Sequence, residues 1–301
     1  MATEKKTDLV VLGSGPGGYT AAFRAADLGL NVILVERYES IGGVCLNVGC
    51  IPSKALLHIA KILDESDEMR DMGVDFGKPK ISAKKLVDWK NSVVNKLTGG
   101  LKALAKQRKV EIVTGVGKFT GSHSMEVVNG KDKNSIEFKH AIIAVGSESI
   151  KLPFIPDDDR IFSSTDALEL KDIKGDLLVI GGGIIGLEMA TVYSSLGVNV
   201  TVVEFMDQIM PGADKDLVTI LKKRMEKKGV KFILKTKVTK VDAKKDALHV
   251  TMEGDNAPDK PLKVKQILLS VGRKPNGGEI DADKAGVKVD ERGFISVDNQ
   301  L

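Results

Sequence analysis

Two stretches of the chain decide the fold: residues 8–36 (DLVVLGSGPGGYTAAFRAADLGLNVILVE) and residues 176–204 (DLLVIGGGIIGLEMATVYSSLGVNVTVVE). They align from end to end without a gap, and every landmark glycine and the closing glutamate are identical. In each, an apolar run meets a glycine-rich turn, a helical stretch ends at Leu-Gly, and a second apolar run ends in glutamate. Unbroken apolar runs around a helix are typical of parallel strands covered on both faces. The repeat predicts an α/β fold with two Rossmann-like domains, each a parallel sheet with helices on both faces.

The glycines of each copy have the G-x-G-x-x-G spacing of a dinucleotide-binding turn. The first permits the tight turn, the second lets the backbone approach a pyrophosphate, and the third allows close helix–strand packing. A glutamate closes the second apolar run of each copy, where it can accept hydrogen bonds from ribose hydroxyls. The residues predicted to bind are Gly13, Gly15, Gly18 and Glu36 in the first copy, and Gly181, Gly183, Gly186 and Glu204 in the second. The alternative, a glycine turn without a ligand, is disfavoured because each motif lies between a strand and a helix.

Glu204 also bears on the choice of coenzyme. Its carboxylate would repel the 2′-phosphate of NADP, and the next residues, Phe205 and Met206, supply no compensating arginine. The second copy is therefore predicted to prefer NAD.

Length and composition limit the function further. The 301 residues are enough for two domains, with 42% hydrophobic and 29% charged residues. The net charge of +4 is mild and the aromatic content is 4%, so a nucleic-acid surface is disfavoured. No apolar run approaches the roughly 20 residues that span a bilayer, and the N-terminus does not resemble a signal peptide. We expect a cytoplasmic protein that contacts no membrane.

The two cysteines lie in residues 42–54, GGVCLNVGCIPSK. In a regular helix, Cys45 and Cys50 would be roughly 8 Å apart, too far for a disulfide, so pairing requires a distortion, for which Gly49 is well placed. Pro52 suits the first turn of a helix, which puts Cys50 near its positive end and Lys54 one turn further, and both features favour a thiolate. A redox-active pair is favoured over a structural disulfide. We expect no metal site, because the four histidines are scattered.

This cysteine segment resembles the redox signature of the pyridine nucleotide-disulfide oxidoreductase family, and the resemblance extends from about residue 8 to the C-terminus. Residues 203–211 (VEFMDQIMP) and 186–188 (GLE) are most similar to the branch that oxidises protein-bound dihydrolipoamide. The resemblance implies that residues 1–148 bind FAD, that residues 149–271 bind NAD, and that residues 272–301 begin the return to the FAD domain.

The resemblance also implies site roles. Cys45 would exchange with the substrate thiols, Cys50 would pass electrons to FAD, and a pair formed by Lys54 and Glu188 would lie near the flavin. The further residues implied to contact FAD are Arg37, Gly43, Lys54, Gly117, Ala144, Gly146 and Ser147, and those implied to contact NAD are Val238 and Gly272.

Family members carry more than this chain holds: a second FAD segment and an interface domain, which provides dimer contacts and a His–Glu pair. We therefore expect weak FAD binding and poor turnover from these 301 residues alone, and a doubtful homodimer. The implied partner is a lipoyl-bearing protein of a 2-oxo acid dehydrogenase or glycine cleavage complex. The alternatives are an NADP-linked relative, such as a glutathione or mercuric reductase, and an inactive nucleotide-binding fragment.

Overall fold

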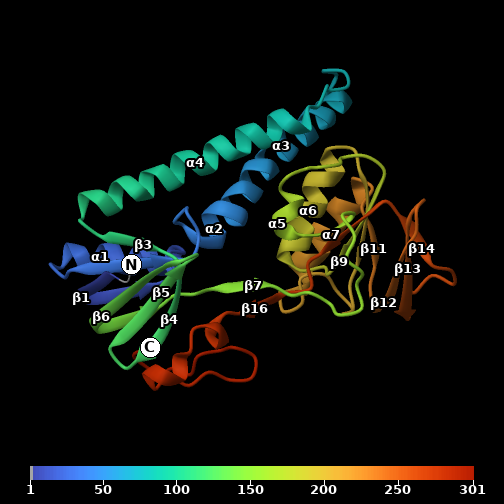
Figure 1. Ribbon diagram of the computed structural model, residues 1–301. Coiled ribbons are helices and arrows are strands. Elements are labelled where there is room, and N and C mark those ends of the chain that lie inside the picture. Colours follow the sequence, from blue (N-terminus) through green and yellow to red (C-terminus); the bar gives the residue numbers. More distant parts are fainter. Residues whose placement is uncertain (1–2) are drawn as a thin grey trace. The chain divides into compact units, whose positions relative to one another are not determined.

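The computed structural model describes residues 3–301, and the chain forms two compact units (Figure 1). The first unit comprises Met1–Ile51, Ser92–Glu148 and Arg273–Leu301. The second comprises Pro52–Asn91 and Ser149–Gly272. The division expected from cofactor binding, at residues 148 and 271, stays a prediction. Residues 52–91, expected in the first domain, fall in the second unit.

The first unit is built on a six-stranded sheet with the order β3-β2-β1-β6-β5-β4. The strands are β1 (Thr3–Leu12), β2 (Val32–Glu36), β3 (Glu111–Thr114), β4 (Val116–Gly121), β5 (Ser124–Asn129) and β6 (Asp132–Ile143). The pairs among β3, β2, β1 and β6 are parallel, as the repeat predicts. The β4–β5 and β5–β6 pairs are antiparallel, so the sheet is mixed.

Alternate side chains at the end of β1 enter two different cores, which is why residues 9–12 are apolar without a break. Val10 and Leu12 pack on one face with the buried Ile33 of β2. Leu9 and Val11 pack on the other face, where helix α1 (Pro16–Asp27) contributes its buried side chains. The strand is therefore covered on both sides, as the continuous apolar run predicts.

The second unit repeats this plan in a five-stranded parallel sheet with the order β11-β10-β9-β15-β8. Its strands are β8 (Ile161–Ser163), β9 (Asp176–Ile180), β10 (Asn199–Val203), β11 (Lys231–Ile233) and β15 (Gln266–Leu269). Its helices include α5 (Ser164–Ala167), α6 (Ile184–Ser195) and α7 (Lys215–Lys227). A three-stranded antiparallel sheet, β12 (Thr236–Ala243), β13 (Leu248–Gly254) and β14 (Leu262–Val264), shares a core with β9.

Three helices and a short 3-10 turn complete the middle of the chain: α2 (Gly43–Val48), α3 (Cys50–Glu68), η1 (Met69–Met72) and α4 (Ala83–Gln107). The apolar spacing of residues 82–109 predicts a long helix interrupted near Gly99 and Gly100, but helix α4 runs without a break through both glycines. Each glycine costs a helix only about 1 kcal/mol, which the apolar stripe of a 25-residue helix outweighs.

Within residues 3–301, the length and composition of one helical stretch, Gly43–Met72, would allow it to cross a membrane. In the structure, 33% of its most apolar window is buried. Polar residues interrupt this stretch, so no unbroken apolar run marks it in the sequence. It is not one continuous helix, since Gly49 separates α2 from α3.

The two chain passages between the units pair as a two-stranded sheet of β7 (Ser147–Ser149) and β16 (Arg273–Pro275). Short 3-10 turns η2 (Gly277–Glu279) and η3 (Ala282–Ala285) follow β16. Ile280 and Ala282 from this region are buried in the core of the first unit.

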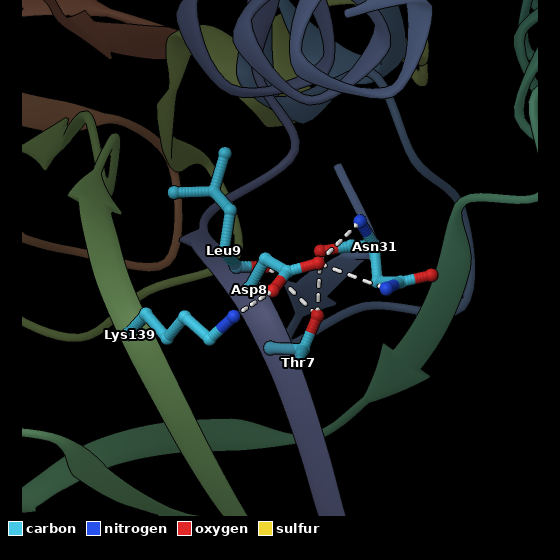
Figure 2. A network of polar contacts seen from close by, with 5 residues as sticks. All are labelled: Thr7, Asp8, Leu9, Asn31 and Lys139. Atoms are coloured by element: carbon cyan, nitrogen blue, oxygen red, sulfur yellow. Dashed lines mark hydrogen bonds and ion pairs between the residues drawn. The ribbon is translucent and has the colours of Figure 1, made fainter. Parts of the chain in front are cut away.

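A polar network anchors the beginning of the first βαβ unit, and Figure 2 shows it. Asp8 accepts hydrogen bonds from the Lys139 Nζ at 2.7 Å and from the Asn31 backbone and side-chain nitrogens at 3.0 and 2.8 Å. These bonds, led by the one from Lys139, lower the pKa of Asp8 to about 2. The second copy keeps the same pair, since the Asn199 side-chain amide donates to Asp176 at 3.1 Å.

Candidate active site

The first turn, residues 13–18, links β1 to α1, and its glycines meet three different requirements. A Cβ on Gly13, where φ is +98°, would lie 2.3 Å from the Ala144 carbonyl oxygen. A Cβ on Gly18 would lie 1.8 Å from the Gly13 carbonyl oxygen, so helix and strand pack too closely for any side chain. Gly15 has no heavy atom within 4 Å of its Cβ position. The space in front of Gly15 is where a pyrophosphate could approach the start of α1.

The second turn, residues 181–186, repeats this geometry between β9 and α6. A Cβ on Gly181 would lie 2.5 Å from the Ser270 carbonyl oxygen, and one on Gly186 would lie 2.3 Å from the Gly181 oxygen. Gly183 again has no heavy atom within 4 Å of its Cβ position. Both turns therefore have the shape that the fingerprint predicts, with the open position at the same glycine.

Each closing glutamate binds back to its own turn. Glu36 accepts three hydrogen bonds, from the Ser14 backbone N–H (3.0 Å), the Ser14 hydroxyl (2.5 Å) and the Tyr38 N–H (3.1 Å). Glu204 accepts only two, from the backbone N–H groups of Gly182 (2.7 Å) and of residue 206 (2.9 Å). A carboxylate offers about four acceptor positions, so about one remains on Glu36 and about two on Glu204. Both carboxylates can still accept a ribose hydroxyl.

The cysteine segment begins directly on the first turn. The Gly42 N–H donates to the Ser14 carbonyl oxygen at 2.9 Å. A Cβ on Gly43, where φ is +60°, would lie 2.6 Å from the Gly15 Cα. Helix α2 starts there and carries Cys45, which is half-buried. The cysteine-bearing helix therefore starts beside the position where a pyrophosphate could bind.

The distortion predicted between the cysteines is present at Gly49. Its φ and ψ of −141° and −116° end α2, and α3 then begins at Cys50, which is exposed. A Cβ on Gly49 would lie 2.8 Å from the Val44 carbonyl oxygen, so the bend itself requires glycine. Cys50 is the first residue of a 19-residue helix, where the N–H groups of the first turn favour a negative charge.

Lys54 and Glu188 lie together within the second unit, as the resemblance implied. The Lys54 Nζ is 3.2 Å from a Glu188 carboxylate oxygen, with side chains 63% and 24% exposed. An ion pair this open contributes little to stability, at most about 1 kcal/mol. Lys54 is one turn after Cys50 in α3, so the helix fixes their spacing.

The turn at residues 144–147 is held by two side chains that the sequence analysis missed. Arg273 donates from Nε to the Ser147 hydroxyl at 2.8 Å and also to the Ser147 carbonyl oxygen. Asn276 donates from its backbone N–H to the Gly146 oxygen at 3.0 Å and from its side-chain nitrogen to the Val145 oxygen at 2.9 Å. The side-chain oxygen of Asn276 is buried and has no hydrogen-bond partner among the described residues. The stretch VGRKPN, which contains both residues, was the available signal.

Four other predicted residues are placed as follows. Gly117 lies in β4, where a Cβ would clash with core side chains, the nearest atom being 2.6 Å away. Val238 points into the core of the second unit and is 8% exposed, so only its backbone could contact NAD. Gly272 has a φ of +117° at the end of that unit. In the first unit, the Arg37 guanidinium lies 5.0 Å from the ring centre of Tyr38. Among residues 3–301 there is no group of three or more histidine, cysteine or carboxylate side chains placed to hold a metal.

Comparison with known proteins identifies what these features resemble. The family model described as pyridine nucleotide-disulphide oxidoreductase matches residues 7–301. Dihydrolipoyl dehydrogenases of Vibrio cholerae and Haemophilus influenzae are 55% and 54% identical over the whole chain. The chain spans 63% of the length of each relative. Among solved structures, the Cu(II) complex of the HOCl-induced flavoprotein disulfide reductase RclA from Escherichia coli matches 99% of this chain and 63% of its own, with a TM-score of 0.85 and 28% identity.

Proposed function

Because the chain belongs to the pyridine nucleotide-disulphide oxidoreductase family, as its cysteine segment predicted, we propose that it takes part in the reaction of its dihydrolipoyl dehydrogenase relatives. In that reaction, protein-bound dihydrolipoamide is oxidised to lipoamide at the expense of NAD+. The observation that carries the proposal is the start of the Cys45 helix on the first dinucleotide turn, where a Cβ on Gly43 would lie 2.6 Å from the Gly15 Cα.

The residues present fit two dinucleotides. In the first unit, Gly13, Gly15 and Gly18 with Glu36 would hold the ADP half of FAD, and the turn at residues 144–147 would border the flavin. In the second unit, the corresponding glycines and Glu204 would hold NAD+. When bound, FAD supplies a two-electron acceptor for thiols and NAD+ supplies the final hydride acceptor. The open Cβ positions at Gly15 and Gly183 support both assignments.

The chain's own chemistry is a thiol–disulfide exchange. One dihydrolipoyl thiolate attacks the sulfur of Cys45 in a Cys45–Cys50 disulfide, and Cys50 leaves as a thiolate. The second substrate thiolate then attacks the substrate sulfur of the mixed disulfide, which closes lipoamide and releases Cys45. The enzyme gains two electrons and the substrate loses two protons, which a base must take up. The N-terminal position of Cys50 in α3 supports its role as the leaving thiolate.

The second unit supports NAD over NADP. Glu204 keeps two acceptor positions, enough for both hydroxyls of an adenosine ribose, whereas a 2′-phosphate would meet its negative charge. This disfavours the NADP-linked alternative. Lys54, paired with Glu188, would act as a positioning residue one helical turn after Cys50 in α3.

Partner and location follow from the same proposal. The substrate group would be presented by a lipoyl-bearing protein of a 2-oxo acid dehydrogenase or glycine cleavage complex. We further propose a cytoplasmic setting, where reduced thiols persist. The bacterial sources of the relatives support this.

The proposal is tested by anaerobic absorption spectroscopy of the chain after incubation with FAD. We expect flavin bands, with a long-wavelength charge-transfer band on addition of dihydrolipoamide. Cys45→Ser should keep that band, because Cys50 remains as a thiolate, whereas Cys50→Ser should abolish it. A colourless protein that retains no FAD would instead support an inactive fragment. Identical spectra from the two variants would refute the assigned roles.

A further inference from the structure

Among the positions at which the two dinucleotide turns differ, one carries a hydroxyl in the first turn only. Ser14 occupies the second place of the first turn, and Gly182 occupies the same place in the second turn. Ser14 is fully buried at 0% exposure. Its hydroxyl donates to Glu36 at 2.5 Å and accepts from the Gly42 N–H at 3.2 Å. A chain of hydrogen bonds thus runs from the Glu36 carboxylate, at the end of β2, through Ser14 to the residue that precedes helix α2.

The second copy provides an internal comparison for this chain. Met210 follows the second copy at the position where Gly42 follows the first, and its N–H donates to the Gly182 carbonyl oxygen at 2.8 Å. The Gly42 N–H donates to the Ser14 carbonyl oxygen at 2.9 Å in the same way. The backbone bond is therefore common to both copies. The hydroxyl bond exists only in the copy that leads into the cysteines.

We propose that Ser14 is a positioning residue that couples the ribose-binding carboxylate Glu36 to the start of the helix that carries Cys45. The inference rests on the proposed function, because it needs FAD at the first turn. It goes beyond that function by assigning a role to a serine outside the cysteine segment.

The physical reason lies in what the hydroxyl does for each partner. Its proton occupies one of the acceptor positions of Glu36, which fixes the carboxylate before a ribose arrives. Its oxygen adds a second acceptor for the Gly42 N–H, where φ is +112° and α2 begins. A hydrogen bond to an ionised group is stronger than a neutral one, and burial strengthens it further. Because equilibrium coupling is reciprocal, ordering of the Gly42 segment favours FAD as much as FAD orders the segment.

The experiment is segment-resolved hydrogen exchange of the full chain without FAD. Ser14→Ala and Ser14→Gly both remove the hydroxyl, and the glycine is what the fold already accepts at Gly182. The matched control, Ser124→Ala, removes a hydroxyl that bonds Thr120 in the same unit. We expect exchange in residues 41–48 to rise roughly fivefold in both Ser14 variants, the factor for about 1 kcal/mol, since the backbone acceptor remains. The control should not change it.

A second readout separates positioning from stability. The alkylation rate of Cys45 relative to Cys50, measured by mass spectrometry, should rise about fivefold in both Ser14 variants because α2 is less firmly held. FAD affinity should fall by a similar factor. If wild type binds no FAD, the proposed function fails, but the exchange and alkylation results still decide the role of Ser14.

Three outcomes would overturn the inference. One is unchanged exchange in residues 41–48. Another is a change in Ser14→Gly alone, which would indicate backbone freedom instead of a lost hydroxyl. The third is a uniform rise over both units, which would mean a general loss of fold.

Discussion

Neighbouring glycines of α1 should respond to the same substitution with opposite sign. Gly17 and Gly18 are consecutive helical residues. A Cβ on Gly17 meets no heavy atom within 4 Å, whereas a Cβ on Gly18 would lie 1.8 Å from the Gly13 carbonyl oxygen and 2.8 Å from its carbon. Gly17→Ala and Gly18→Ala therefore add the same methyl group in the same helix turn, but only position 17 has room for it.

The magnitudes follow from this difference. Gly17→Ala should stabilise the first unit by about 0.5 kcal/mol, because alanine loses less backbone entropy in a helix. Gly18→Ala should cost about 3 kcal/mol or more, the upper end for overpacking, because the obstructing atom belongs to backbone that cannot rotate away. FAD affinity should also fall in Gly18→Ala, since the whole turn must shift.

Native-state hydrogen exchange of peptides from β1 and β2 measures the free energy of unfolding in the first unit. Peptides from β9 and β10 in the second unit serve as the internal reference and should not change. If the two variants shifted stability in the same direction, or if Gly18→Ala cost less than about 1 kcal/mol, the packing argument for the third fingerprint glycine would be wrong.

Three further changes have defined outcomes. The pKa of Asp8 is about 2 in the folded protein, against an ordinary 3.8. The ionised Asp8 side chain therefore stabilises the fold above pH 4, and this stabilisation is lost as pH falls towards 2. The free energy of unfolding, measured as a function of pH, should therefore decline less steeply over that range in Asp8→Asn than in the wild type. Lys90→Met removes a buried ammonium that donates to the Leu168 oxygen at 3.0 Å. It should lower the free energy of unfolding of the second unit by roughly 2 kcal/mol, measured by Trp89 fluorescence during urea unfolding. Glu204→Ala should weaken NAD+ binding roughly tenfold, as measured by calorimetry. If the preference of the variant for NAD+ over NADP+ were unchanged, Glu204 would not have the role proposed for it.

Much of the fold and site could be read from local sequence. The internal repeat sufficed for two βαβ units, because the periodicity of apolar residues and the glycine spacing are properties of the chain itself. The bend at Gly49 was foreseeable from the spacing of Cys45 and Cys50, since a regular helix cannot bring them together. The family followed from residues 42–54, and the family model over residues 7–301 confirms it. The dihydrolipoamide-oxidising branch followed from residues 203–211 and stays a proposal.

Other features depended on contacts between residues distant in the chain. The contacts of residues 52–91 group them with the second unit, which local sequence did not show. The sequence also predicted an interruption of α4 at Gly99, but the cost of a glycine in a helix is outweighed by the apolar stripe of this 25-residue helix. The stretch VGRKPN did not show which carbonyl oxygens the Asn276 amide would bind, and nothing local showed that the Ser14 hydroxyl would meet the distant Gly42 N–H. Backbone pattern is encoded locally, whereas the partner of a buried hydroxyl or amide is fixed only when the strands are assembled.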